Sequence, residues 1–310
     1  MDLAFLLFQK VLVMLIFLGI GAICFKSKLI TAEGNKSITN FVLYAATPCL
    51  IFASFQQEYS KKLLIGLFVT VGLSVIGFIL YIIFARIILR KKDDANSMVE
   101  RFSVIYTNCG FMGIPLANEL FGAEGVFYIT AFNALFSILV WSHGVYLITG
   151  ETTNISFKRV LLNPSIISTV IGIVFFCASI SLPELPRSAV NSISAVVSPL
   201  AMVVAGVTIA QTNILKALKN PRIYFIAFAK LLLLPIVLAV VLTLIFKQTS
   251  INNTVLLTTI LAFACPTATI GTMFAIRYNK NATYAAEIFA LTTIASVITM
   301  PIVIYIQSLI

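Results

Sequence analysis

The stretch TNCGFMGIPL, residues Thr107–Leu116, places an asparagine, two glycines and a proline inside an apolar segment long enough to cross a membrane. Glycine and proline are the weakest helix formers. At membrane depth, broken backbone is tolerated only where protein or a water-filled cavity satisfies its polar groups. The stretch therefore predicts a discontinuous transmembrane helix beside a functional site.

The whole chain has the composition of a polytopic membrane protein. It has 310 residues, of which 60% are hydrophobic and 10% charged, and its mean hydropathy is +1.06. Soluble domains carry about 25% charged residues. Apolar runs long enough to span a hydrocarbon core about 30 Å thick recur along the chain. We expect an all-α fold with ten transmembrane helices, at residues 3–25, 37–56, 63–89, 99–121, 125–148, 160–181, 188–210, 223–246, 253–276 and 284–307.

The basic residues predict the orientation of these spans. With the N-terminus outside, the predicted inner loops hold 15 Lys and Arg residues, and the outer loops hold four. Basic residues gather in cytoplasmic loops, so both termini are expected outside. The net charge of +10 is then a topology signal rather than a sign of nucleic-acid binding.

The spacing of four prolines that lie within predicted spans indicates an internal repeat. Pro48 and Pro115 are 67 residues apart, as are Pro199 and Pro266, so the two halves align at an offset of 151. Each half holds five spans, and an odd number inverts the second copy in the membrane. We expect two inverted five-helix repeats, residues 1–150 and 151–310.

The fourth and ninth spans, which we expect to be broken, predict an anion-binding site. Half-helices should start near the two prolines, because proline suits the first helical position. Two helix N-termini, each with about half a positive charge, would then meet near the midplane and attract an anion. The predicted substrate-binding residues here are Asn108, Cys109, Gly110, Gly113, Pro115, Pro266, Thr267 and Thr269.

The second and seventh spans are weaker candidates. Pro48, with Thr47 beside it, and Pro199, with Ser198 beside it, are equally consistent with packed kinks and with substrate-binding residues.

Polar side chains inside other spans are also candidates. Lys230 lies about 12 Å deep, where it either serves an anionic substrate or extends its ammonium group to the inner surface. Lys10 is expected to extend to the outer surface in that way. Asn133 should face the protein interior, as a weaker site candidate. His143, the sole histidine, is expected to have a hydrogen-bonded packing role rather than to relay protons.

The distribution of acidic residues fits an anion carrier. All lie in tails, loops or near span ends, whereas cation exchangers place carboxylates on a buried ion path. An enzyme is not expected, because one histidine excludes an HExxH zinc site and no pair of buried aspartates exists. No cofactor or metal is expected. A carrier is favoured over a channel, because paired broken helices in inverted repeats suit alternating access.

Four motifs resemble those of the auxin efflux carrier family. They are TPCLIF at 47–52, NCGFMGIPL at 108–116, SPLAMVVAG at 198–206 and ACPTATIGTMFA at 264–275. The family includes plant auxin exporters and bacterial malate and malonate permeases, and the similarity covers essentially the whole chain. The short loop at about 149–159 resembles that of the bacterial members.

The resemblance implies a fold shared with bile-acid sodium symporters and sodium–proton antiporters. It implies a scaffold of spans 1, 2, 6 and 7, and a transport domain of spans 3–5 and 8–10, with spans 4 and 9 crossing at Pro115 and Pro266. The family's asparagine in the fourth span corresponds to Asn108. Plant members have an asparagine after each crossover proline, where this chain has Leu116 and Thr267, which argues against auxin as substrate. A homodimer and an elevator-type movement are also implied.

Together these observations predict a secondary transporter of a small organic anion, a carboxylate, in the lipid bilayer of a bacterial inner membrane. A sodium-coupled symporter on the same fold is the alternative, since backbone carbonyl groups can bind sodium without a carboxylate.

Overall fold

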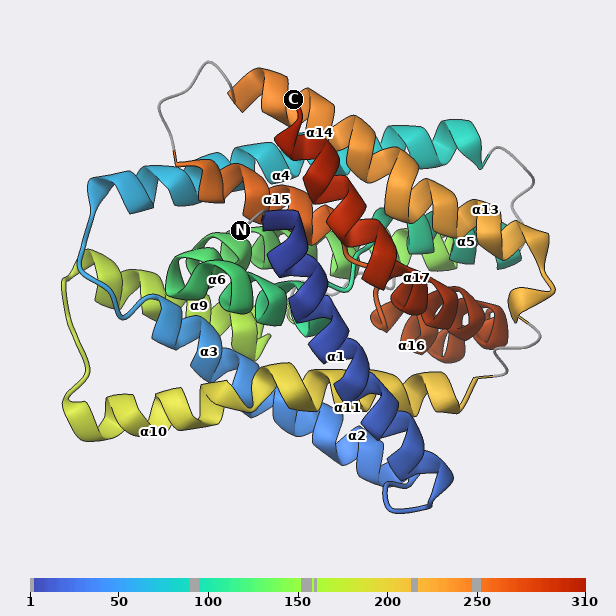
Figure 1. The fold of residues 1–310 in the computed structure, drawn as a ribbon, viewed down its shortest axis with the longest axis horizontal. Helices are drawn as coiled ribbons and strands as arrows, with labels where there is room; N and C mark the ends of the chain where they lie inside the picture. Colours follow the sequence, from blue (N-terminus) through green and yellow to red (C-terminus); the bar gives the residue numbers. More distant parts are fainter. Residues whose placement is uncertain (1–2, 90–94, 152–157, 159–160, 213–216, 247–251) are drawn as a thin grey trace.

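The computed structural model describes residues 3–89, 95–151, 158, 161–212, 217–246 and 252–310. Within these ranges the chain is helical, and the only extended pairing is an isolated bridge between Thr107 and Thr267. Figure 1 shows the arrangement of the helices. Their bounds are α1 Leu3–Lys26, α2 Ala32–Phe41, η1 Val42–Ala46, α3 Thr47–Ser54, α4 Lys61–Ile88, α5 Ala95–Ile105, η2 Cys109–Gly113, α6 Ile114–Leu139, η3 Val140–Gly144, α7 Val145–Thr149, α9 Pro164–Cys177, α10 Glu184–Ala195, α11 Val197–Ala210, α13 Pro221–Phe228, η4 Ala229–Leu233, α14 Leu234–Phe246, α15 Asn253–Ala264, α16 Ile270–Arg277 and α17 Ala282–Ser308.

Several of these helices begin where the sequence offers an asparagine, followed in two cases by proline. Asn163 and Asn220 cap α9 and α13 by accepting a backbone N–H two residues on, and a proline follows each of them. Asparagine satisfies an amide that the helix leaves unpaired, and proline has no amide to satisfy at the first position. Asn252 and Asn281 cap α15 and α17 in the same way.

Seven helical stretches are long and apolar enough to cross a membrane. One of them, Cys109–Thr149, has 41 residues and is interrupted at Gly122, where φ is +61°. The chain reverses there, because Gly125 packs against the carbonyl group of Ala117. Two shorter apolar helices are α9 and α15. Large apolar side chains such as Ile16, Ile23 and Phe68 are exposed, as expected for surfaces that face lipid. The fold is that of a polytopic membrane protein.

Close helix contacts depend on glycine at the crossing of α1 and α11. A Cβ atom at Gly21 would lie 2.1 Å from the carbonyl oxygen of Val203, and one at Gly206 would lie 1.9 Å from that of Leu18. Small residues let transmembrane helices approach closely. The two backbones are therefore in direct contact over this crossing.

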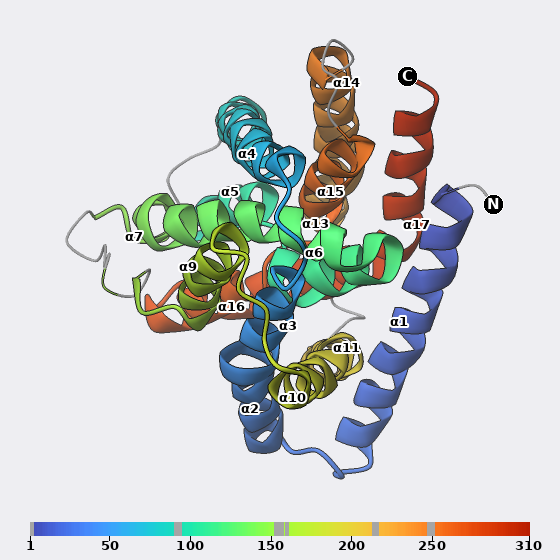
Figure 2. The same ribbon diagram turned by 90° about the vertical axis from the view of Figure 1, so that its left-hand side faces the viewer.

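The remaining helices pack in two neighbouring sets. In one set, α1 and α2 lie on α11, and α3 lies on α9 and α10. In the other, α6 packs on α4 and α15, and α17 packs on α13, α14, α15 and α16. Figure 2 shows α1 beside α17 at one edge, where the two sets meet.

An ion pair also joins the two sets. Lys10 on α1 donates from Nζ to Oε2 of Glu119 on α6, at 2.8 Å. The Lys10 ammonium group therefore has a carboxylate partner on a neighbouring helix, and its extension to the outer surface stays a prediction.

Candidate functional site

Two interrupted helices cross through backbone hydrogen bonds. α5 ends at Ile105 and α15 ends at Ala264, and both chains are extended beyond these ends. The Asn108 amide donates to the carbonyl of Pro266 at 2.7 Å, and the Ala268 amide donates to the carbonyl of Tyr106 at 3.0 Å. These two bonds form the antiparallel bridge of Thr107 with Thr267. We call residues 106–108 and 265–269 the crossover.

The position of the first break differs from the prediction. The half-helix does not start near Pro115, because η2 begins at Cys109 and continues into α6 through Pro115. Pro266, by contrast, lies inside the second break, as predicted. The bridged residues are 160 positions apart, so the two breaks do not correspond at the offset of 151 at which the prolines align.

A π-helical turn before each of three prolines explains how these helices contain proline without being interrupted. The residue before Pro48, before Pro115 and before Pro235 donates its amide to a carbonyl five residues back rather than four. Proline lacks an N–H, and its ring clashes with the carbonyl four residues earlier. The π-turns η1, η2 and η4 relieve that clash, so these prolines do not divide their helices.

The start of the first half-helix offers unpaired amides. The N–H groups of Cys109, Gly110 and Phe111 donate to no group in the described ranges. The first amides of any helix lack intrahelical partners, and such groups bind anions readily. Two helix N-termini do meet at the crossover, with η2 and α16 starting from it in the two halves of the chain.

Polar side chains surround this helix start. The Asn108 side-chain oxygen accepts a hydrogen bond of 3.2 Å from the Thr269 hydroxyl, and its amide nitrogen has no partner in the described chain. Asn133 on α6 faces Gly110, since its Oδ1 is the one atom within 4 Å of the position of a Cβ on Gly110. Gly110 is half-buried, so a small open space lies between it and Asn133. The structure thus brings Asn108, Gly110, Asn133 and Thr269 together.

Thr267 is held in place by other residues. Its hydroxyl donates to the carbonyl of Ser103 on α5, and its amide donates to the Thr292 hydroxyl on α17 at 3.4 Å. The Thr107 hydroxyl is fully buried and has no hydrogen-bond partner in the part of the chain described. Thr267 therefore fixes the crossover, while Thr107 retains an unused hydroxyl.

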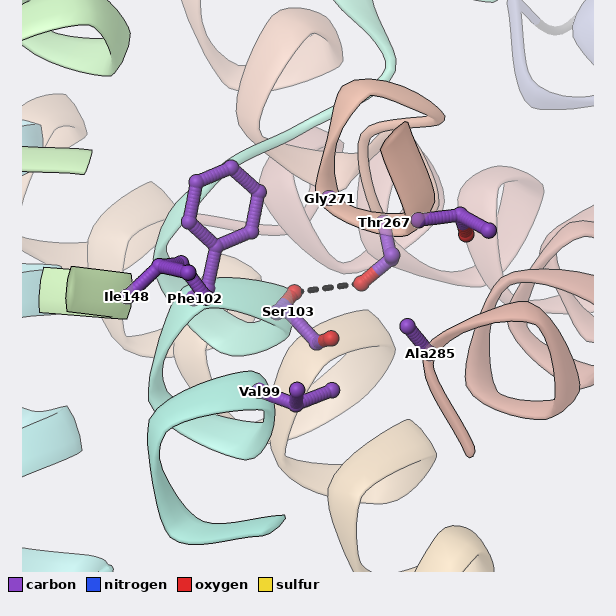
Figure 3. Close-up of a pocket in the computed structure, with 8 residues that line it drawn as sticks. Val99, Phe102, Ser103, Ile148, Thr267, Gly271 and Ala285 are labelled. Atoms are coloured by element: carbon purple, nitrogen blue, oxygen red, sulfur yellow. Dashed lines mark hydrogen bonds between the residues drawn. The ribbon is translucent and has the colours of Figure 1, made fainter. Parts of the chain in front are cut away.

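A narrow pocket lies beside Thr267, between α5, α7, α16 and α17 (Figure 3). Figure 3 shows Phe102 and Ile148 on one side of it and Ala285 on the other, with the Ser103–Thr267 hydrogen bond across its floor. In this conformation the pocket has essentially no room for a water molecule. The crossover is therefore closed on this side.

Gly113 and the two crossover cysteines share one packed region. A Cβ on Gly113 would lie 3.3 Å from the sulfur atoms of both Cys109 and Cys265, which are free and fully buried. Both thiols pack against Gly113. Gly113 is thus a packing position.

Lys230 is buried within η4 and does not reach a surface. Its exposed fraction is 0%, and its Nζ has no hydrogen-bond partner among the described residues. Nζ lies 5.1 Å from the centre of the Tyr81 ring. The alternative that Lys230 extends to the inner surface is wrong, because the ammonium group is held over an aromatic ring instead.

The second pair of candidate prolines lies on α3 and on α11, and α11 packs against η2. Thr47 and Pro48 are buried where η1 joins α3, and Ser198 and Pro199 are half-buried in the first turn of α11. None of the four has a hydrogen bond to a crossover residue in the described chain.

Several residues at the site were not predicted from the sequence. Ser103 and Thr292 bind Thr267. Below them, the buried carboxylate of Glu100 accepts two hydrogen bonds from Arg222 and one from the Tyr284 hydroxyl, linking α5, α13 and α17. Serine and threonine are common in transmembrane helices, so nothing in their local pattern marks these contacts.

The fold and this crossover define a membrane protein built around broken, crossing helices. A family model described as "Membrane transport protein" matches residues 6–304. The chain belongs to this family, the auxin efflux carrier family, and it is a transporter rather than an enzyme.

Two relatives cover nearly the whole chain. An "Uncharacterized transporter" of Methanothermobacter thermautotrophicus is 23% identical over 308 residues, which cover 95% of this chain and 96% of that protein. A protein of Rhizobium meliloti named "Putative malonate transporter" is 25% identical over 287 residues, which cover 88% of this chain and 87% of that protein.

Proposed function

We propose that this transporter carries a small organic anion, a carboxylate, and that it binds the anion at the crossover. The observation that carries this proposal is the set of unpaired donors at one point. Three backbone amides of the half-helix and the amide nitrogen of Asn108 have no partner within the described ranges, and they adjoin the open space that Asn133 faces. Donors without acceptors suit a ligand that supplies only acceptors.

The charges near the site support an anion rather than a cation. No carboxylate in the described chain is hydrogen-bonded to a crossover residue. Glu100, Glu119 and Glu124 bind Arg222, Lys10 and Asn252 instead. Lys230, whose Nζ is buried without a hydrogen-bond partner in the described chain, is a second group that could pair with an anion. At the crossover a carboxylate would therefore meet helix N-termini and donors, and one buried carboxylate of the described chain, that of Glu287 on α17, has an unpartnered oxygen.

The proposed architecture has ten spans in two inverted repeats, at residues 1–150 and 151–310. Division of the Cys109–Thr149 stretch at Gly122 turns the seven long stretches into eight spans. Helix α9 is a ninth span, and α15 together with α16 is the tenth. The helix set that contains α1, α3 and α11 would be the scaffold, and the set that contains the crossover would be the transport domain. We propose an elevator-type movement, a homodimer, and an inner-membrane location with both termini outside.

A sodium-coupled symporter is the second candidate. The C-termini of α5 and α15, at Ile105 and Ala264, also end at the crossover. Helix C-termini expose carbonyl groups and partial negative charge, which suit a sodium ion.

A thermal-shift screen of purified protein with mono- and dicarboxylates tests both candidates. Malonate is the first probe, because one relative is named for it, and each compound is measured with and without sodium. Stabilisation without sodium supports the anion carrier, and stabilisation only with sodium supports the symporter.

A pair of variants then locates the site. Asn108→Ala should weaken binding by about 1–3 kcal/mol, because a hydrogen bond to a charged group is lost. Asn191→Ala changes an exposed asparagine on α10 and should bind normally. Native affinity in Asn108→Ala would move the anion away from the crossover.

A further inference from the structure

One π-turn in this protein has no proline to explain it. In η3, Val145 donates its amide to the carbonyl of Val140, five residues back, but Tyr146 follows where the other three π-turns have proline. A π-turn is rarer and less favourable than an α-turn, and such turns are frequent at functional sites. The residues that η3 positions therefore need a separate explanation.

The side chain that η3 presents is His143, the single histidine of the chain. Its Nδ1 lies 2.8 Å from the hydroxyl oxygen of Tyr106, and that hydroxyl donates to the carbonyl of Leu139 at 3.0 Å. Tyr106 has only one hydroxyl proton. When that proton is donated to the Leu139 carbonyl, the Tyr106 oxygen can only accept a hydrogen bond from His143. Nδ1 must then carry a proton for the contact between His143 and Tyr106 to be a hydrogen bond.

This arrangement assigns the two ring nitrogens different roles. The hydrogen bond of one nitrogen sets which of the two titrates. When the Tyr106 hydroxyl proton is donated to Leu139, Nδ1 donates to Tyr106, and Nε2 is the nitrogen that gains and loses a proton. His143 is half-buried, so the protein encloses its ring only in part.

Few charged groups compete for this ring. Arg86, an exposed residue near the end of α4, is the nearby basic side chain whose charge would disfavour a proton on the ring. On the helices packed nearby, Glu100 binds Arg222, Arg101 donates to the carbonyl of Leu89, and Arg277 lies over the ring of Tyr278. The other neighbours are aromatic or apolar, including Phe102 and Tyr106 beside Gly144.

Tyr106 connects the histidine to the crossover. Its ring is fully buried, and its backbone carbonyl accepts the Ala268 amide, one of the two bonds that hold the crossing chains together. Thr107 and Asn108 follow directly. Tyr106 thus fixes the backbone next to the unpaired amides of the half-helix. A change in the hydrogen bonding of its hydroxyl group therefore acts on this part of the crossover.

We propose that His143 is a proton-binding site and that Tyr106 couples its charge to anion binding at the crossover, so that the carrier binds a carboxylate and a proton together. The second part of this proposal rests on the proposed function. A positive charge on the ring favours an anion nearby, so carboxylate affinity should fall as pH rises through the titration of His143. By linkage, the bound anion must favour protonation of His143 by the same factor.

The first experiment needs no ligand. Because the chain has one histidine, protein labelled with ¹³C-histidine gives a single imidazole signal, whose titration is followed by NMR from about pH 5 to about pH 8. Tyr106→Phe should shift the midpoint, because Nδ1 loses its acceptor. Tyr146→Phe removes the hydroxyl of an exposed tyrosine on α7 in the same way, and it should leave the midpoint unchanged. An absent titration, or the same midpoint in Tyr106→Phe, overturns the proposal.

The second experiment measures malonate affinity over the same pH range. Wild type should lose at least about fivefold in affinity, whereas His143→Asn, which keeps a donor near the Nδ1 position but cannot titrate, should show a flat profile. A wild-type profile in His143→Asn overturns the coupling, provided that its thermal unfolding shows an intact fold. If no carboxylate binds at any pH, the proposed function fails, and the histidine titration in Tyr106→Phe alone decides on the proton site.

Discussion

Replacing Gly110 with alanine should separate anion binding from folding. A Cβ atom at this position would meet only Oδ1 of Asn133, at 4.0 Å, which is an ordinary contact distance. Gly110 lies in a helical turn, and alanine is the better helix former by up to about 1 kcal/mol. Gly110→Ala should therefore leave the free energy of unfolding unchanged or raise it by at most that amount.

The same methyl group should oppose anion binding. It would stand in the open space between the unpaired amides and Asn133, where the carboxylate is proposed to lie. Hydrogen bonds to charged groups contribute about 1.5–3 kcal/mol each. Loss of one such bond corresponds to a loss of affinity of about 10- to 150-fold, and loss of more than one bond would increase it.

The assay is calorimetric titration of the purified variant with the carboxylate that stabilises wild type, beside a thermal unfolding curve. Gly72→Ala on α4 is the matched control, because it makes the same change in an exposed helical turn where a Cβ atom meets nothing within 4 Å. The control should bind as wild type does. Wild-type affinity in a stably folded Gly110→Ala protein would show that the anion does not occupy this space.

Three further predictions concern packing, charge and topology. Gly206→Ala should lower the free energy of unfolding by about 1–3 kcal/mol, because its Cβ would lie 1.9 Å from the Leu18 carbonyl oxygen, whereas Gly19→Ala meets nothing within 4 Å; unfolding curves compare the two. Lys230→Met should keep the fold but lose anion affinity, with part retained in Lys230→Arg, and native affinity in purified Lys230→Met would leave the lysine a packing role. In a cysteine-free background, cysteine at Lys61 should react with an impermeant maleimide in whole cells and cysteine at Lys91 should not; the reverse pattern would overturn the orientation.

Several of the polar residues that gather at the crossover were predictable because they stand out in the local sequence. Asn108, Gly110 and Thr269 stand out as polar or helix-breaking residues in apolar segments, where only a cavity or a tertiary partner makes them tolerable. Asn133 was predicted to face the interior for the same reason, and the structure places it opposite Gly110. The outcome for Lys230 needed the structure, because the choice between a surface and a ring depends on where Tyr81 lies.

The contacts that hold the crossover were not predictable from composition or spacing. Ser103 contributes a backbone carbonyl to Thr267, and every residue has such a group. Thr292 is one of two adjacent threonines on α17, and only the relative rotation of the helices decides which one meets Thr267. The role of Tyr106 is similar, because its partners Leu139 and His143 become neighbours only after the fifth span has packed on the fourth.

The first helix break was predicted near Pro115 but lies before Cys109, which shows why proline alone does not locate a crossover. Pro115 follows a glycine-rich turn that widens to a π-turn, so its clash is relieved inside the helix. At the bridge itself, the donors are the amides of Asn108 and Ala268, so Pro266 supplies only its carbonyl and its missing N–H costs nothing. Tyr106 supplies the matching carbonyl, but its own amide closes the last turn of α5 on Phe102, which proline could not do. The pairing of the two extended segments therefore determines where the two helices are interrupted. Proline occurs at position 266, where no hydrogen bond requires a backbone amide, and not at position 106, where the amide is used.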